Sequence, residues 1–182
     1  SGGVLNGGGS LNVGGSFSQS GGSINLSGPV VIAQTSGNLN VGSITASGIT
    51  LSAPTGSISQ GGALLTPGLL NVQSQTGISL VNPGNQISNF SGMVTGTGHV
   101  DLDNTGALNI VQLTTANGGI TVTNTGGIVT QNAVSATGGQ ISITANSPLT
   151  VGSGGVSATG NVTLVASNLT STGNMTLNGN VS

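Results

Sequence analysis

The sequence predicts an all-β protein, a right-handed parallel β-helix (β-solenoid) wound from triangular coils of about 21 residues. Three observations support this prediction. Short apolar–polar–apolar triplets recur along the chain, turn-forming residues separate them, and equivalent triplets return at a nearly constant interval. Helix signals are nearly absent, because Glu, Lys and Arg are missing and no i, i+3, i+4 apolar pattern is sustained. The right-handed winding is expected because parallel crossovers usually have that hand.

Each triplet is expected to form a short strand, because successive side chains point to opposite faces of a strand. Its two apolar residues would face inward and its middle residue outward. Gly, Asn, Ser and Pro lie between the triplets, as turns require. In chain order the triplets are Ile24–Leu26, Leu39–Val41, Ile49–Leu51, Leu70–Val72, Ile78–Leu80, Val100–Leu102, Leu108–Ile110, Ile120–Val122, Ile141–Ile143, Leu149–Val151, Val162–Leu164 and Met175–Leu177.

The spacing arranges these strands in three rows, which predicts three strands per coil. The first row contains Ile78, Val100, Ile120, Ile141 and Val162, at intervals of 22, 20, 21 and 21 residues. The second contains Ile87, Leu108, Ile128, Leu149 and Leu169, and the third contains Met93, Leu113, Val134, Val156 and Met175. Upstream, Leu39/Ile44/Ile49 and Ile58/Leu64/Leu70 fit as earlier coils.

The whole chain, residues 1–182, is therefore interpreted as one solenoid segment. Residues 1–20 are a less regular start, and residues 21–182 form about eight coils. Stacked at ~4.8 Å, these coils would make a rod of roughly 40 Å. Because residues 161–182 still repeat, we expect the segment to belong to a longer fibre or to dock onto another copy.

Composition excludes several classes of function. The chain has two Asp, one His and no Lys, Arg, Cys, Trp or Tyr. Nucleic-acid binding requires cations against phosphate and aromatic side chains that stack on bases. Zinc and redox-cysteine sites require ligands that are missing, and no cofactor is predicted. The longest apolar run, Val30–Ala33, is far shorter than the ~20 residues of a membrane helix, so no membrane insertion is expected.

Every ionisable side chain lies in one short run, His99-Val100-Asp101-Leu102-Asp103. In a strand, Val100 and Leu102 would face inward while His99, Asp101 and Asp103 face out together. One interpretation is a Ca²⁺ site, although two carboxylates ~7 Å apart supply fewer oxygens than the six to eight that calcium takes. The other is a solvated patch, or a polar interruption that discourages incorrect stacking. Apart from this candidate metal site, no catalytic or binding residue is predicted.

The chain is not expected to be an enzyme. Glycosidases require two carboxylates placed across a scissile bond, whereas Asp101 and Asp103 lie on the same strand. A lyase would also need a cationic group to stabilise the carbanion, and the chain contains no Lys or Arg. A Ser–His–acid arrangement remains open, because 25 Ser accompany the single His.

Three stretches resemble the repeat shafts of filamentous haemagglutinin-like exoproteins, the two-partner secretion adhesins of Gram-negative bacteria. They are Gly48 to Thr66 (GITLSAPTGSISQGGALLT), Gly68 to Ile87 (GLLNVQSQTGISLVNPGNQI) and Asp103 to Gln131. The resemblance implies secretion through an outer-membrane partner, a long β-helical fibre and adhesion. The secretion domain of that family carries an Asn-Pro-Asn-type motif, from which Asn82-Pro83-Gly84-Asn85 departs, so the chain resembles the shaft.

The expected function is that of a structural rod in a secreted or cell-surface bacterial adhesin or extracellular filament. It would act in adhesion, cell–cell contact or matrix, and would self-associate head-to-tail or laterally unless it continues within a longer chain. Two alternatives remain open, namely a glycan-binding or ice-binding outer surface and a β-helical polysaccharide-degrading enzyme. The expected location is extracellular or on the bacterial cell surface.

Overall fold

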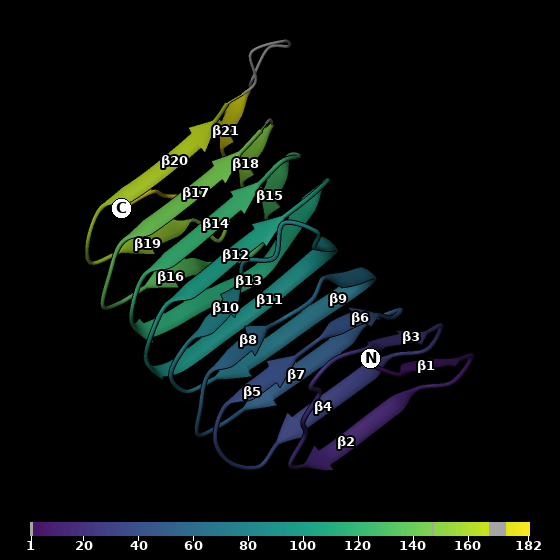
Figure 1. Ribbon diagram of the computed structural model, residues 1–182. Coiled ribbons are helices and arrows are strands. Elements are labelled where there is room, and N and C mark those ends of the chain that lie inside the picture. Colours follow the sequence, from purple (N-terminus) through teal and green to yellow (C-terminus); the bar gives the residue numbers. More distant parts are fainter. Residues whose placement is uncertain (1, 147, 168–173) are drawn as a thin grey trace.

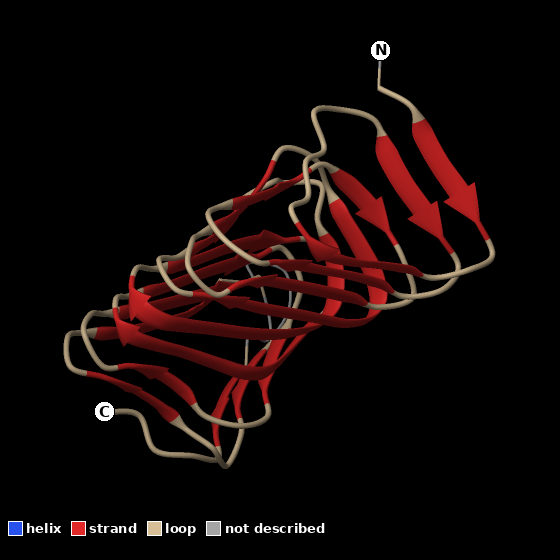
Figure 2. Ribbon diagram, turned by 90° about the horizontal axis from the view of Figure 1, so that it is seen from below, coloured by secondary structure: helices blue, strands red, loops and turns tan. Residues whose placement is uncertain are grey.

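The computed structural model describes residues 2–146, 148–167 and 174–182. Within these residues it contains only strands and turns, with no helix (Figure 2). The strands form a 14-stranded and a 7-stranded sheet, and every strand pair is parallel. The chain is therefore a β-solenoid, as the repeated triplets predict, and its strands stack as successive layers from the N-terminal to the C-terminal end (Figure 1).

Three faces surround the interior, and we number them 1 to 3. Face 3 is the 7-stranded sheet, formed by β5 (Leu39–Val41), β8 (Ile58–Gln60), β10 (Ile78–Leu80), β12 (Val100–Asn104), β14 (Ile120–Asn124), β17 (Ile141–Ala145) and β20 (Val162–Ala166). The first predicted row lies on this face and is paired in the predicted register. Its residues are Ile78, Val100, Ile120, Ile141 and Val162. The upstream pairs Leu39–Ile58 and Ile58–Ile78 are also confirmed.

Faces 1 and 2 belong to the larger sheet. Face 1 contains β1 (Val4–Gly7), β3 (Ser23–Leu26), β6 (Ser43–Thr45), β15 (Ile128–Thr130), β18 (Leu149–Val151) and β21 (Met175–Leu177). Face 2 contains β2 (Leu11–Gly15), β4 (Val30–Gln34), β7 (Ile49–Ala53), β16 (Val134–Ala136) and β19 (Val156–Ala158). Three long strands, β9 (Leu64–Ser74), β11 (Gln86–Thr97) and β13 (Leu108–Asn117), run across both faces and join them.

The interior is a continuous aliphatic column, because alternate residues of each strand point inward. In β14, Ile120 and Val122 are each 1% exposed, whereas Thr121 and Thr123 are exposed. The same alternation along the middle coils buries Ile, Leu, Val and Ala together with Phe90. Each coil therefore covers the apolar side chains of its neighbours, and the stack is stabilised by nearest-neighbour contacts.

The corners between faces bring the backbones of successive coils close together. A Cβ atom on Gly118 would lie 1.8 Å from the carbonyl oxygen of Gly98 in the preceding coil. No side chain fits in that space, so a residue without a Cβ is required there. This close approach is one reason why glycine is so abundant in the sequence.

The second predicted row is correct in its middle and out of register at its first residue. Leu108, Ile128 and Leu149 are paired in register. Ile87 is one residue out of step, because Asn89 lies opposite Asn109 while Ile87 lies opposite Thr66. Leu169 falls outside the described residues. The residue opposite Leu149 is Met175, because β21 begins nine residues after β20 ends.

The third predicted row also requires a correction at two positions. Leu113, Val134 and Val156 are paired as expected. Gly92, not Met93, lies opposite Leu113, because an irregularity after Phe90 shifts the alternation of β11 relative to β13. Met93 is consequently outward and 40% exposed. Met175 belongs to face 1, and Val181 is the residue that bridges to Val156.

Candidate functional site

The three ionisable side chains lie together on the outer surface of face 3. His99 immediately precedes β12 and is exposed, and Asp101 and Asp103 are half-buried outward residues of that strand. The residues between them, Val100 and Leu102, are buried at 0% and 1% exposure. The structure thus places these side chains on one surface, in the alternating arrangement that the sequence predicts.

The neighbours of the two carboxylates are small hydroxyl side chains. Asp101 lies between Ser79 and Thr121 in the register of face 3, and Asp103 lies beside Thr123. Across the described residues, no group of three or more His, Cys, Asp or Glu side chains is arranged to hold a metal ion. The carboxylates and hydroxyls of this surface therefore form a polar patch, to which His99 contributes a separate interaction.

His99 forms a hydrogen bond between successive coils. Its Nδ1 accepts a hydrogen bond of 2.9 Å from the backbone N–H of Gly119, at the entrance to β14. An imidazole that accepts at Nδ1 carries its proton on Nε2, so the contact fixes the tautomer of the ring. This geometry gives the only His a structural role at the corner that leads into face 3.

A column of buried amides lies at the corner where face 3 leads into face 1. Asn85, Asn104 and Asn124 are exposed by 0%, 3% and 2%. Asn104 Nδ2 donates to Asn124 Oδ1 over 3.0 Å and to the carbonyl oxygen of Ile87, whose N–H donates back to Asn104 Oδ1. Asn124 Nδ2 donates to the carbonyl oxygen of Gly106 in the preceding coil and to that of Gly127 in the turn that follows. These amides replace backbone hydrogen bonds that the corner interrupts.

Asn85 has a comparable role one coil earlier. Its Oδ1 accepts hydrogen bonds from the Leu64 N–H and from Gln60 Nε2, and its Nδ2 donates to the carbonyl oxygens of Leu80 and Asp103. Asn82 Oδ1 accepts from the Gly84 N–H, which closes the preceding turn. The Asn82–Asn85 segment is therefore a structural corner, which accounts for these asparagines without a secretion motif.

This column of amides was not predicted from the sequence. The available signal was the equivalent place of Asn104 and Asn124 at the end of two strands, 20 residues apart. Such a signal is weak in a chain with 20 Asn, most of which suit turns. Burial, which distinguishes these asparagines from the others, is visible only in the folded chain.

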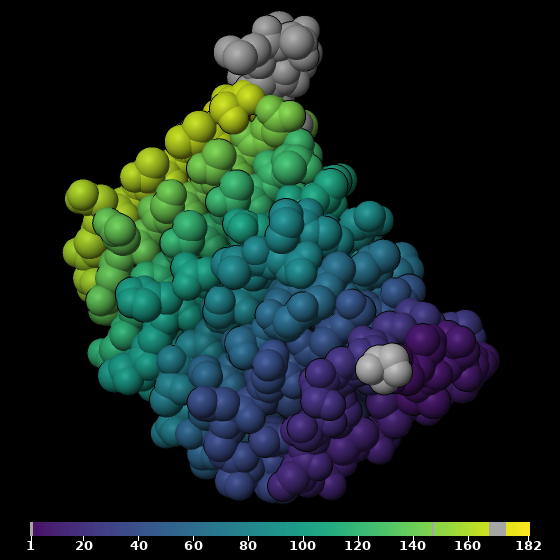
Figure 3. All heavy atoms as spheres, in the orientation of Figure 1, coloured from purple at the N-terminus to yellow at the C-terminus, as the bar shows by residue number. Residues whose placement is uncertain are grey.

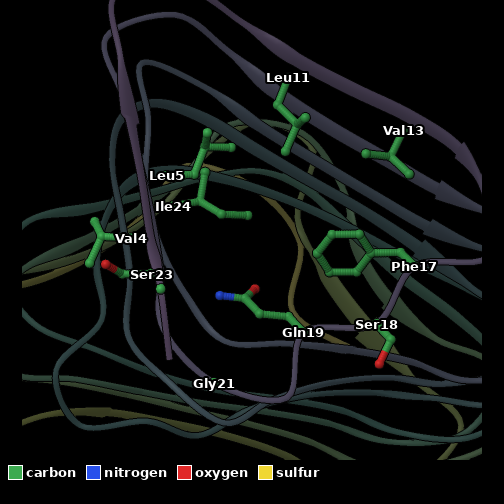
Figure 4. Close-up of a pocket in the computed structure, with 11 residues that line it drawn as sticks. Val4, Leu5, Leu11, Val13, Phe17, Ser18, Gln19, Gly21, Ser23 and Ile24 are labelled. Carbon is green, nitrogen blue, oxygen red and sulfur yellow. The ribbon is translucent and has the colours of Figure 1, made fainter. Parts of the chain in front are cut away.

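Besides these polar groups, the interior opens at the first coil in an apolar groove of about 460 Å³. Figure 4 shows Leu11, Phe17 and Ile24 around this space, and none of its lining residues is ionisable. The segment that carries Phe17 connects β2 to β3, where other coils place a strand of face 3. Its backbone is held by a hydrogen bond from the Phe17 N–H to Gln34 Oε1, 2.8 Å long.

Two further depressions, of about 400 and 580 Å³, lie side by side on face 1 and share Ser88 and Ala107. Their apolar lining includes Leu65, Val129 and Pro148, and no ionisable residue lines either of them. Chemically, these surfaces can bury apolar groups and exchange hydrogen bonds with neutral partners. They offer no acid, base or nucleophile beyond hydroxyl groups.

Comparison with known proteins agrees with the repetitive architecture. The model of a family described as "Repeats of unknown function (DUF5649)" matches residues 27–96. No curated protein matches the chain, and no solved structure matches it. The matched part begins before β4 and ends within β11, so it covers consecutive coils that differ in strand length but share one winding pattern.

Within the described residues, no helix is long and apolar enough to span a bilayer. In the space-filling view, colour changes in successive bands from one end of the molecule to the other, because the coils are stacked in chain order (Figure 3). The candidate functional features are consequently surfaces that recur from coil to coil, together with a single charged patch.

Proposed function

We propose that this chain is a structural rod in a secreted or cell-surface bacterial adhesin or extracellular filament. The observation that carries the proposal is the stack of parallel strands on three faces around an aliphatic interior, with register shifts confined to the pairing of β11. Such a stack holds a fixed shape along one axis. It can therefore keep a distal element at a set distance from a cell, or supply the body of a filament.

The chemistry of the side chains supports a mechanical role over a catalytic one. The polar side chains that are buried, such as Asn104 and Asn124, are occupied by hydrogen bonds that hold the coils together. The carboxylates of Asp101 and Asp103 lie on one strand, which is unsuited to acid–base attack from two sides of a bond. We therefore propose that the chain has no enzymatic activity.

The adhesive and extracellular parts of the proposal rest on the resemblance to filamentous haemagglutinin-like shafts. That resemblance would also imply an outer-membrane secretion partner. The absence of Lys and Arg removes every cleavage site for trypsin-like proteases, a property suited to an exposed fibre. A net formal charge of only −2 allows such rods to approach each other with little repulsion.

An ice-binding surface is less well supported by the register of face 3. A regular array would need Thr at both outward positions of successive strands. The two outward columns contain Asp101/Asp103, Thr121/Thr123, Ser142/Thr144 and Thr163/Val165. Only one of these four strands carries Thr at both positions, so we do not propose this function.

Electron microscopy and adhesion assays on the native protein test the proposal. The protein isolated from cells should form thin fibres, and cells that lack it should adhere less to surfaces or to each other. The matched control replaces Asp101 and Asp103 by Asn, which should leave both fibres and adhesion unchanged. A compact particle without fibres, or loss of adhesion on that double substitution, would contradict a purely structural rod.

A further inference from the structure

Four outward side chains form one column on the larger sheet. Leu69, Asn89, Asn109 and Val129 lie in register on successive coils. Leu69 and Val129 are 42% and 44% exposed, which places them among the most exposed large apolar residues of the chain. Between them, Asn109 Nδ2 donates a hydrogen bond of 3.0 Å to Asn89 Oδ1.

The order of this column is the same in both directions: apolar, amide, amide, apolar. Its midpoint lies between Asn89 and Asn109. A second copy laid on this face in the opposite direction would place Leu69 of each copy against Val129 of the other, and amide against amide. This is the self-complementarity that an interface with two-fold symmetry requires.

Hydrogen-bonding capacity is also left at the centre of the column. Asn89 Nδ2 makes only a long contact of 3.5 Å with the carbonyl oxygen of Gly68. An amide nitrogen has two protons, so Asn89 can donate to a carbonyl oxygen of a second copy. Hydrogen bonds from the central Asn pair would therefore orient the two copies, while the flanking Leu69 and Val129 would provide apolar contact.

The distribution of charge favours the same face. His99, Asp101 and Asp103 all lie at or on β12, on face 3. Two copies that met through face 3 would bring these carboxylates together, whereas the column from Leu69 to Val129 contains no ionisable side chain. Pairing through the column removes no charge from water, which makes it the less costly contact.

We propose that two copies of this chain pair laterally and antiparallel through the column Leu69–Asn89–Asn109–Val129. The inference rests on the proposed function and names its partner: a second rod running in the opposite direction, as on two cells that face each other. Pairing about the midpoint between β11 and β13 overlaps eight of the nine strands in this row of the sheet. A strip of that length and three to five residues wide offers about 500 Å² per copy, below the ~800 Å² of a standard interface. One segment should thus pair weakly, and several in succession should pair more tightly.

Cysteine cross-linking tests the pairing, because the chain contains no Cys. Leu69→Cys and Val129→Cys are made separately, and each variant is treated with a short bis-maleimide alone and in an equal mixture. The mixture should yield a cross-linked dimer that neither variant yields alone. We expect a roughly tenfold excess over the control, because an interface holds two thiols at a millimolar effective concentration.

The control pair is Ser79→Cys with Thr121→Cys, which lie on face 3 on either side of Asp101. Cross-linking of Leu69→Cys or Val129→Cys with itself would indicate parallel pairing and overturn the proposed direction. A yield of cross-linked dimer equal to that of the control pair would overturn the proposed pairing of two copies through the column. Small-angle scattering of the same samples at low concentration separates this failure from failure of the rod itself, because an unpaired rod keeps its elongated shape.

Discussion

At the scale of single residues, the packing of one coil is adjusted by a large and a small side chain together. Phe90 is fully buried, and a Cβ on its neighbour Gly92 would lie 3.0 Å from the Phe90 ring and 2.7 Å from Leu113 Cδ1. In the preceding coil the equivalent residues are Leu70 and Val72. The absence of a side chain at Gly92 therefore provides the space that Phe90 occupies.

This compensation predicts a specific result for substitutions at the two positions. Gly92→Val should lower the free energy of unfolding by about 1–3 kcal/mol, because it overfills the core. Adding Phe90→Leu should recover much of that loss, because the coil then has the Leu–Val pair of its neighbour. Denaturant unfolding of the two single variants and the double variant measures the coupling. Additive losses would contradict the compensation.

A second prediction concerns an oxygen without a partner. Asn109 Oδ1 is the buried side-chain oxygen that, among the described residues, has no hydrogen-bond partner. Val129 is the next residue of its column. Val129→Asn should extend the ladder of amides and raise the free energy of unfolding by about 1 kcal/mol. Val129→Thr is the control, since its shorter side chain should give no such gain in the same denaturant titration.

At the scale of strands and corners, the sequence predicts the parts of the fold that repeat strictly. Face 3 follows its predicted register because its strands are joined by segments of similar length. On face 1 the residue opposite Leu149 is Met175, because the segment between β20 and β21 is longer than the corresponding segments of earlier coils. Ile87 is buried but one residue out of register, and Met93 points outward, because irregular pairing of β11 shifts the alternation by one residue. Periodicity identifies inward positions only while no residue is inserted.

The candidate site was less predictable than the fold. Outward placement of His99, Asp101 and Asp103 follows from strand alternation alone. The hydrogen bond from the Gly119 N–H to His99 Nδ1 does not, because it depends on how the corners of two coils approach. The buried amides were missed for the same reason, since exposed and buried asparagines look alike in the sequence.

The amide column gives a prediction at this scale. Asn124→Ala should lower the free energy of unfolding by about 2–4 kcal/mol, because the Gly106 and Gly127 carbonyls and Asn104 Nδ2 all lose a partner. Alanine fits the space, as Ala145 occupies the equivalent position of the next coil. Thermal unfolding measures the loss. Thr123→Ala, at an exposed position, should change stability by less than about 0.5 kcal/mol.

At the scale of the whole molecule, the coil is the unit that can be added or removed. Deletion of residues 120–140 removes one complete coil, because Ile120 and Ile141 are equivalent in register. The shortened protein should remain folded and lose about 4.8 Å of length. Deletion of residues 120–129 alone should disrupt the stack, because later strands would move to the wrong face.

Small-angle scattering and circular dichroism of the two deletions check this prediction. The complete-coil deletion should keep the β-sheet spectrum and a cooperative melting transition, with a slightly smaller longest dimension. The partial deletion should lose cooperativity. Equal behaviour of the two proteins would indicate that the coils are not interchangeable units and would contradict the nearest-neighbour view of their stability.

The hydrogen bonds between coils run along the axis of the rod, so a pulling force applied to its ends loads them directly. Layers should then detach from an end one at a time instead of sliding past each other. Each detached layer of 21 residues would lengthen the tether by roughly 65 Å, far more than the ~4.8 Å that the layer contributed to the folded rod. Such a rod would yield gradually under flow and dissipate mechanical work before its attachment to a surface breaks.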